Sequence, residues 1–395
     1  MLRRRFGAVG AAVIVAFALA SAPASAAAHG STRVGEARSD VLSVESDERA
    51  ADLVADMTTA EQAASVVMGH IPTTDAAALH AYMQQGLGGF ILMGANIPAT
   101  DDELQTLTAA LLADPALPPL IAIDQEGGLV SRLDRDEFPA STSLKSLPAA
   151  DSAAAFSARA ALVARAGINV NFGTVADVTS DSSSFIYGRA LGTDPQSAAE
   201  RVVAATTAQE QVVASTLKHF PGHGAAPGDS HHAIPTTGET IDEWRATDAV
   251  PFVAGVEAGA SLLMFGHLAY TAVDTAPASL SPRWHEIARE ELGFDGVIVT
   301  DDLGMLQSSG IPEYADPVRN AVSAVVAGSD LVLMIAGSTP DTAGQIVQGL
   351  TAAVDAGTLP VDRLTEAATR VMSLRLQSTS ATADWALCPE CEPVD

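Results

Sequence analysis

Residues 296–302 read Gly-Val-Ile-Val-Thr-Asp-Asp, an apolar run that leads directly into two carboxylates. The run shows no alternation of apolar and polar side chains, which predicts a strand buried on both faces, as in a parallel sheet. Similar short apolar runs recur along the chain, and together the eight runs predict a sheet of eight parallel strands. The other seven lie at 66–71, 89–93, 120–124, 168–175, 213–220, 262–267 and 330–335.

Segments with helical spacing of apolar residues lie between these runs. Eight strand–helix units over about 320 residues are typical of a single (β/α)8 TIM-type barrel, which is the α/β fold that we predict. An open doubly wound sheet is the alternative, but no Gly-x-Gly-x-x-Gly turn follows an early run. The helical segments are 101–113, 152–166, 195–211, 242–258, 282–291, 314–327 and 361–376, preceded by a helix expected from Asp52.

The N-terminus has the pattern of an export signal. Arg3, Arg4 and Arg5 precede an apolar segment over 8–19, and Ala24-Ser25-Ala26 forms a small-residue cleavage site. We therefore expect a signal peptide over 1–26, export by the Sec or the twin-arginine route, and a secreted or wall-associated protein without a membrane anchor.

The rest of the chain divides into three parts. We expect a flexible lead-in over 27–45, one barrel domain over 46–378 and a tail over 379–395. The tail holds the two cysteines of the chain, Cys388 and Cys391, whose pairing in a small disulfide loop stays open.

The charge of the chain argues against two classes of partner. It has 21 Lys and Arg against 48 Asp and Glu, a formal net charge of −27 at pH 7. Such a surface repels nucleic acid and anionic membranes, so we expect neither as a partner. We expect a monomer.

Polar residues follow several of the predicted strands. In a (β/α)8 barrel, functional residues lie at the carboxyl ends of the strands. Residues at such ends are Asp124, Gln125, Glu126, Lys218, His219, His267, Asp301 and Asp302. Asp301 comes first after its strand, which favours it as a nucleophile that forms a covalent ester. The alternative is that one of the two aspartates caps a helix starting near Leu303, an interpretation that suits Asp302 better.

Asp229 and His231 lie two residues apart on a segment rich in Gly and Pro. A carboxylate beside an imidazole fixes its tautomer and raises its basicity, so the pair could act as general acid and base. Incidental residues on a polar surface loop are the alternative. A metal site built from His219, His223 and their neighbours is disfavoured, because Phe-Pro-Gly between these two histidines prevents a helix; we expect no metal or other cofactor.

Asp124 precedes Gly127 and Gly128, two glycines that allow a backbone to approach a ligand closely. A carboxylate at a strand end can accept hydrogen bonds from two neighbouring sugar hydroxyls. The alternative is a buried salt bridge between Asp124 and Arg132.

Three motifs, in this order, resemble glycoside hydrolase family 3, and most closely its β-N-acetylglucosaminidase branch, the NagZ type. They are Ile-Asp-Gln-Glu-Gly-Gly-Leu-Val-Ser-Arg-Leu (123–133), Lys-His-Phe-Pro-Gly-His-Gly through Asp-Ser-His (218–231) and Val-Thr-Asp-Asp-Leu-Gly-Met (299–305). The resemblance implies a retaining hydrolase for terminal, non-reducing β-linked N-acetylglucosamine. It implies Asp301 as nucleophile and His231, paired with Asp229, as acid/base. The residues that it implies for sugar binding are Asp124, Arg132, Arg189, Lys218 and His219.

The carbohydrate substrate implied by the resemblance is a peptidoglycan fragment or a chitooligosaccharide. The alternatives are a β-glucosidase or an N-acetylglucosaminide phosphorylase of the same family, and a secreted sugar-binding protein without catalysis. A metal-dependent hydrolase is a further alternative.

Overall fold

The structure is a computed structural model that describes residues 45–385, with side chains described to residue 378. The predicted signal peptide, all of the predicted lead-in except residue 45, and Cys388 and Cys391 lie outside the described residues. Among the described residues, no helix has the length and apolar composition that a membrane span requires.

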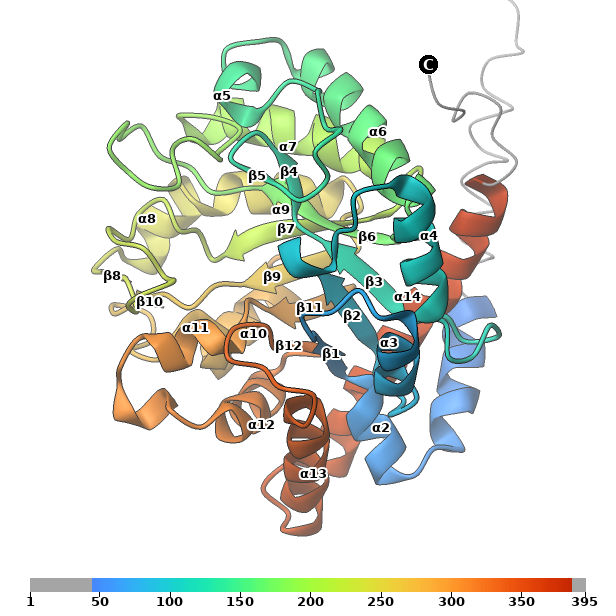
Figure 1. Ribbon diagram of the computed structural model, residues 1–395. Coiled ribbons are helices and arrows are strands. Elements are labelled where there is room, and N and C mark those ends of the chain that lie inside the picture. The colour runs from blue at the N-terminus through green and yellow to red at the C-terminus, as the bar shows by residue number, and fades with distance from the viewer. Residues whose placement is uncertain (1–44, 386–395) are drawn as a thin grey trace, which may run out of the picture. The chain divides into compact units, whose positions relative to one another are not determined.

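All eight predicted strands form one parallel sheet, with the spatial order β11-β9-β7-β6-β3-β2-β1-β12 (Figure 1). A parallel bridge between Val299 and Leu331 joins β11 to the segment that enters β12, so the sheet closes on itself. The prediction of a (β/α)8 barrel is therefore confirmed. The strands are β1 (Val67–Gly69), β2 (Gly89–Leu92), β3 (Leu120–Ile123), β6 (Val170–Val175), β7 (Ala214–Phe220), β9 (Leu262–Phe265), β11 (Val297–Thr300) and β12 (Val332–Leu333).

Helices surround the strands (Figure 1). They are α2 (Thr59–Ser65), α3 (Ala76–Met83), α4 (Asp101–Ala110), α5 (Ser141–Leu144), α6 (Ala149–Arg165), α7 (Pro195–Gln209), α8 (Ile241–Ala246), α9 (Ala249–Glu257), α10 (Pro282–Glu286), α11 (Leu303–Ser308), α12 (Pro317–Ala327), α13 (Thr342–Asp355) and α14 (Val361–Trp385). Two pairs of short strands lie outside the barrel sheet. One is the antiparallel pair β4 (Gln125–Gly127) and β5 (Val130–Ser131), and the other is the parallel pair β8 (Thr236–Thr237) and β10 (Ala269–Tyr270).

Alternate strand residues fill the inside of the barrel, and the residues between them pack outward against the helices. The inward set forms one buried cluster that includes Met68, Ile91, Leu120, Ala122, Val170, Phe172, Leu262, Met264, Val297, Val299, Leu331 and Leu333. Because both faces of each strand are buried, the runs show no regular alternation of apolar and polar residues, which is the property that identified them in the sequence.

Two segments that were each predicted as one continuous helix are interrupted in the structure. The helix expected from Asp52 ends at residue 55, and α2 begins after Thr58, which forms a capping box with Glu61. The helix expected over 242–258 is divided into α8 and α9 at Thr247, whose backbone leaves the helical conformation. Apolar spacing continues through both breaks, so periodicity alone does not detect them.

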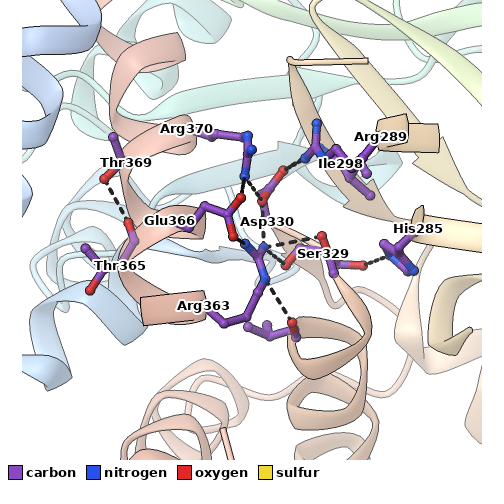
Figure 2. A network of polar contacts seen from close by, with 12 residues as sticks. His285, Arg289, Ile298, Ser329, Asp330, Arg363, Thr365, Glu366, Thr369 and Arg370 are labelled. Carbon is purple, nitrogen blue, oxygen red and sulfur yellow. Dashed lines mark hydrogen bonds and ion pairs between the residues drawn. The ribbon is translucent and has the colours of Figure 1, made fainter. Parts of the chain in front are cut away.

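A buried carboxylate ties the last helix to the barrel (Figure 2). Asp330, which is fully buried, accepts the backbone N–H of Ile298 at 2.9 Å and pairs with Arg363 at 2.6 Å. It also pairs with Arg289 and, at 3.5 Å, with Arg370. Asp330 therefore connects strand β11 with two arginines of α14 at a place closed to water.

We expect Asp330→Ala to lower the free energy of unfolding by roughly 3–5 kcal/mol, because it removes the fully buried carboxylate that three partly buried arginines share. Glu366→Ala is the matched control, since Glu366 pairs with Arg363 and Arg370 from a half-exposed position. That control should cost about 1 kcal/mol or less. Urea unfolding of both variants checks the difference; equal costs would contradict the structural role of Asp330.

Candidate active site

One cavity at the carboxyl ends of the strands collects seven of the eight predicted site residues: Asp124, Arg132, Arg189, Lys218, His219, His231 and Asp301. The eighth, Asp229, lines a neighbouring cavity and reaches the first one through its contact with His231. Apolar side chains such as Met264 and Leu333 complete the wall. Residues up to 177 positions apart in sequence therefore meet at one end of the barrel, from Asp124 to Asp301.

The two adjacent aspartates after β11 have different surroundings. Asp302 is the N-cap of α11: its carboxylate accepts the N–H of Gly304 at 2.9 Å and also those of Ile335 and Ala336. The capping alternative thus applies to Asp302. The Asp301 carboxylate lines the cavity and accepts only the N–H of Asp302, at 2.8 Å, among the hydrogen bonds of the described residues.

Asp301 is ionised at neutral pH. Burial alone would raise the pKa of its carboxyl, but the neighbouring imidazoles of His219 and His267 and the Asp302 N–H outweigh burial and lower that pKa below the ordinary value. An ionised carboxylate on a fixed strand end is able to attack an electrophilic carbon.

Charged side chains on one side of the cavity form a continuous network. Lys218 Nζ lies 2.9 Å from Asp124 and 2.7 Å from Glu126, and Arg189 holds Glu126 through two hydrogen bonds of 2.9 and 2.7 Å. Arg132 lies 3.3 Å from Asp124, so the salt bridge considered from the sequence is present within the cavity. Burial opposes ionisation, but Lys218 and the arginines lower the pKa of both Asp124 and Glu126 to about 2.

His219 is oriented by a buried carboxylate that the sequence analysis did not single out. Its Nδ1 lies 2.7 Å from Asp177, and its Nε2 lies 3.2 Å from a guanidinium nitrogen of Arg189. Since Arg189 can only donate, Nε2 accepts and the ring proton is on Nδ1. Burial and the charge of Arg189 lower the pKa of His219 well below its ordinary value, so the ring is neutral.

Two functional side chains received no role from the sequence: Asp177, which was not singled out, and Glu126, which was placed only as a polar residue after the third run. Asp177 follows β6 by two residues, so the rule that site residues follow strands would have found it. Glu126 lies on β4, a short strand outside the barrel sheet, and its partner Arg189 is 63 residues away. Nothing in the local pattern marks that pairing.

Asp229 and His231 form a dyad on the loop that follows β7. His231 Nδ1 lies 2.6 Å from Asp229 Oδ1, and the His231 backbone N–H donates to the same oxygen at 3.0 Å. The carboxylate thereby fixes the ring proton on Nδ1 and leaves Nε2 available for proton transfer. Burial opposes ionisation, but the two hydrogen bonds from His231 together outweigh it and lower the pKa of Asp229.

The base of this loop is anchored by two buried aromatic side chains. The indole N–H of Trp244 donates to the carbonyl of Pro221 at 2.8 Å, and the hydroxyl of Tyr270 donates to the carbonyl of Gly222 at 2.7 Å. By contrast, His231 and Asp229 keep 55% and 41% of their side-chain surface exposed. The loop therefore has a fixed base and an open end that carries the dyad.

A carboxyl pair lies against this anchored base. Asp248 sits so close to Gly222 that a Cβ there would meet its carboxyl oxygen at 2.7 Å, and Thr247 donates to Asp248 or to Glu239. Burial, with the negative charge of Glu239, raises the pKa of Asp248 to about 8. Asp248 is therefore a neutral acid in the folded protein at neutral pH.

We expect Asp248→Asn to remove part of the loss of stability that occurs as the pH rises from about 4 to about 8. The folded-state pKa is raised, so the group stabilises the fold fully below about pH 4 and loses that contribution as pH rises towards about 8. Asparagine keeps the shape and does not ionise. The variant should therefore gain stability relative to the wild type between pH 5 and pH 9, by roughly 1–3 kcal/mol at the upper end. Urea unfolding across that pH range measures it; parallel curves for the two proteins would contradict the prediction.

A cavity larger than the one around Asp301 lies elsewhere. It measures about 720 Å³ and lies at the amino ends of β9 and β11, against α14, where Ser261, Gly296 and Arg370 contribute to its wall. Catalytic residues of (β/α)8 barrels lie at the opposite end, so we assign no chemistry to it. Among the described residues, no group of three or more His, Cys, Asp or Glu side chains is arranged to hold a metal ion.

Comparison with known proteins identifies relatives along most of this chain. A Beta-hexosaminidase of Stenotrophomonas maltophilia is 36% identical over 277 residues, which cover 67% of this chain and 80% of that relative. A solved glycoside hydrolase family 3 beta-N-acetylglucosaminidase from a Paenibacillus species has a TM-score of 0.74 at 30% identity, covering 82% of this chain and 63% of that one. A solved Beta-N-acetylhexosaminidase from Beutenbergia cavernae has a TM-score of 0.70 at 27% identity, covering 81% of this chain and 99% of that one.

This chain thus spans less than two thirds of the Paenibacillus protein and nearly all of the Beutenbergia one. The names of these relatives confirm the prediction of a glycoside hydrolase enzyme. Residues 52–374 match the family described as Glycosyl hydrolase family 3 N terminal domain, which confirms the resemblance of the three motifs. The chain belongs to glycosyl hydrolase family 3.

Proposed function

We propose that the protein is an exported, retaining β-N-acetylhexosaminidase. It removes terminal, non-reducing β-linked N-acetylglucosamine from peptidoglycan fragments or chitooligosaccharides. The observation that carries the proposal is the meeting of two groups in one cavity: the ionised carboxylate of Asp301 and the imidazole of His231, which Asp229 holds in one tautomer. Export rests on the N-terminal signal pattern and on no described residue.

In the first step, His231 carries a proton on both ring nitrogens: Asp301 attacks the anomeric carbon while His231 gives the Nε2 proton to the leaving glycosidic oxygen and keeps the Nδ1 proton that faces Asp229. The C–O bond to the leaving group breaks and a glycosyl–aspartate ester forms. In the second step, His231 takes a proton from a water molecule, the water oxygen attacks the same carbon, and the carboxylate of Asp301 is released. Two inversions give net retention of configuration.

The charged network beside Asp301 binds the sugar hydroxyls. Asp124 accepts from hydroxyls, whereas Lys218 and Arg132 donate to them, and each is held by a partner of opposite charge before substrate arrives. Such preorganisation avoids part of the cost of ordering side chains on binding. Glu126 supports this set by fixing Lys218 and Arg189.

The stereochemistry of the first product tests the mechanism. With 4-nitrophenyl N-acetyl-β-glucosaminide, proton NMR should show the β-anomer of N-acetylglucosamine before mutarotation. An α-anomer as first product would exclude the double displacement. Faster turnover of the β-glucoside than of the N-acetyl-β-glucosaminide would favour the glucosidase alternative. A glycosyl phosphate formed in phosphate buffer would favour the phosphorylase alternative. No turnover of either glycoside would favour the sugar-binding protein without catalysis.

A further inference from the structure

His223 is a buried histidine on the wall of the active-site cavity, and its ring makes no hydrogen bond within the part of the chain that the structure describes. Only 1% of the residue is exposed, and neither ring nitrogen has a hydrogen-bond partner among the described residues. Its buried neighbours differ: His219 binds Asp177 and Arg189, and both ring nitrogens of His267 are engaged, at 2.7 and 2.8 Å. Buried polar groups are nearly always paired, so an unpaired ring facing a substrate cavity indicates a contact that the substrate supplies.

The ring of His223 is held in place from several sides. Its backbone N–H donates to Asp177 at 2.6 Å, next to the two anchored carbonyls of Pro221 and Gly222. The edge of the ring meets Phe185 at a centroid distance of 4.6 Å and an angle of 74°, and it meets the ring of His219 at 6.1 Å. Phe185 also lines the cavity. His223 is thus fixed before substrate binds.

The protonation state limits what His223 can recognise. Burial lowers the pKa of its imidazole below the ordinary value, although Asp177 acts in the opposite direction, so the ring is neutral. A neutral imidazole has one donor and one acceptor and suits an uncharged polar group rather than an anion. Phe185 beside it offers an apolar surface. An amide that carries a methyl group matches the two side chains together.

The position of His223 relates it to one part of the sugar. The hydroxyl-binding network lies around Lys218 and Asp124, whereas His223 belongs to the loop that carries His231 and lines the same cavity, with its ring centroid 6.1 Å from that of His219. It is also within electrostatic range of Asp301, the group that faces the anomeric carbon in the proposed mechanism. The substituent next to the anomeric carbon is the one at C2.

We propose that His223 and Phe185 form the site for the 2-acetamido group, with a ring nitrogen of His223 hydrogen-bonded to the amide and Phe185 in contact with the acetyl methyl group. The proposal rests on the hexosaminidase function and adds to it the residues that distinguish an N-acetylglucosaminide from a glucoside. A glucoside has only a hydroxyl at C2, so it makes neither contact.

The test compares kcat/KM for 4-nitrophenyl N-acetyl-β-glucosaminide and 4-nitrophenyl β-glucoside in His223→Leu, His223→Gln and Phe185→Ala. We expect His223→Leu to lower kcat/KM for the N-acetyl substrate roughly 10- to 100-fold, the usual effect of losing one buried hydrogen bond. Its value for the glucoside should change less than about threefold by the same reasoning. Glutamine can donate and accept, so His223→Gln should recover part of the loss, and Phe185→Ala should also lower the preference.

His232→Leu is the matched control, because it changes an exposed histidine of the same loop and should leave the ratio between the two substrates unchanged. If the glucoside is turned over too slowly to measure, the inhibition constants of N-acetylglucosamine and glucose as competitive inhibitors replace kcat/KM, and their ratio reports the preference for the acetamido group. Equal losses on both substrates in folded His223→Leu would overturn the proposal and make His223 a structural residue. A wild-type protein that cleaves no N-acetyl-β-glucosaminide would instead overturn the proposed function.

Discussion

Asp301→Ala is expected to abolish turnover of aryl N-acetyl-β-glucosaminides, with a fall in kcat of roughly 10⁴-fold or more, as for other residues that form a covalent intermediate. The carboxylate lines the cavity, is ionised, and is not used as a helix cap, because Asp302 has that role. Without it no glycosyl ester can form. Steady-state assays with the 4-nitrophenyl substrate measure the fall.

A small anion gives this prediction a second readout. Azide can enter the space that Asp301→Ala leaves and attack the anomeric carbon from the same face, which yields an α-glycosyl azide. Asp295→Ala is the matched control, since Asp295 is an exposed carboxylate just before the same strand, at its other end. Wild-type rates in Asp301→Ala would remove this residue from the mechanism.

His231→Ala is expected to slow hydrolysis by roughly 10²–10⁴-fold when the leaving group is a sugar or an alkyl alcohol, and much less when it is 4-nitrophenolate. A poor leaving group needs a proton as the bond breaks, and the Nε2 of His231 is the nitrogen that Asp229 leaves available. Plotting the logarithm of kcat/KM against leaving-group pKa should therefore give a steeper negative slope for the variant than for the wild type.

Asp229→Asn separates orientation from proton transfer. It keeps His231 but removes the carboxylate 2.6 Å from Nδ1, so its loss should lie between those of the wild type and His231→Ala. His232→Ala serves as the control on the same loop. If the loss in His231→Ala does not depend on the leaving group, another residue is the general acid.

The barrel could be predicted because its strands are buried on both faces. Runs such as 297–300 do not alternate apolar and polar residues, and this signal does not depend on contacts made elsewhere. Breaks within helical segments were harder to predict. The capping box at Thr58, for example, starts a new helix without interrupting the apolar spacing. The small elements α5, β4 and β8 carry no periodic signal at all.

The site was predictable where residues follow strands and unpredictable where a role depends on a distant partner. Asp124 and Asp301 were found by their place after apolar runs, and His231 by its short spacing from Asp229. Glu126 has a role only because Arg189 reaches it across 63 positions. His223 was noted in the sequence only as a possible metal ligand; its unpaired ring becomes visible once the packing around it is known.

The fixed base of the loop that carries Asp229 and His231 limits how far a change in this loop would disturb the rest of the enzyme. Trp244 and Tyr270 hold the carbonyls of Pro221 and Gly222 by hydrogen bonds, just before the part of the loop that carries Asp229 and His231. Cleaving or replacing the loop beyond Gly224 would therefore leave the barrel folded. Asp124, Lys218, Arg132 and Arg189, the side chains proposed to bind the sugar, all lie outside that segment, so such a change would leave them in place. Cleavage of the loop by a protease would therefore remove the acid/base pair and leave a protein that binds the sugar without hydrolysing it.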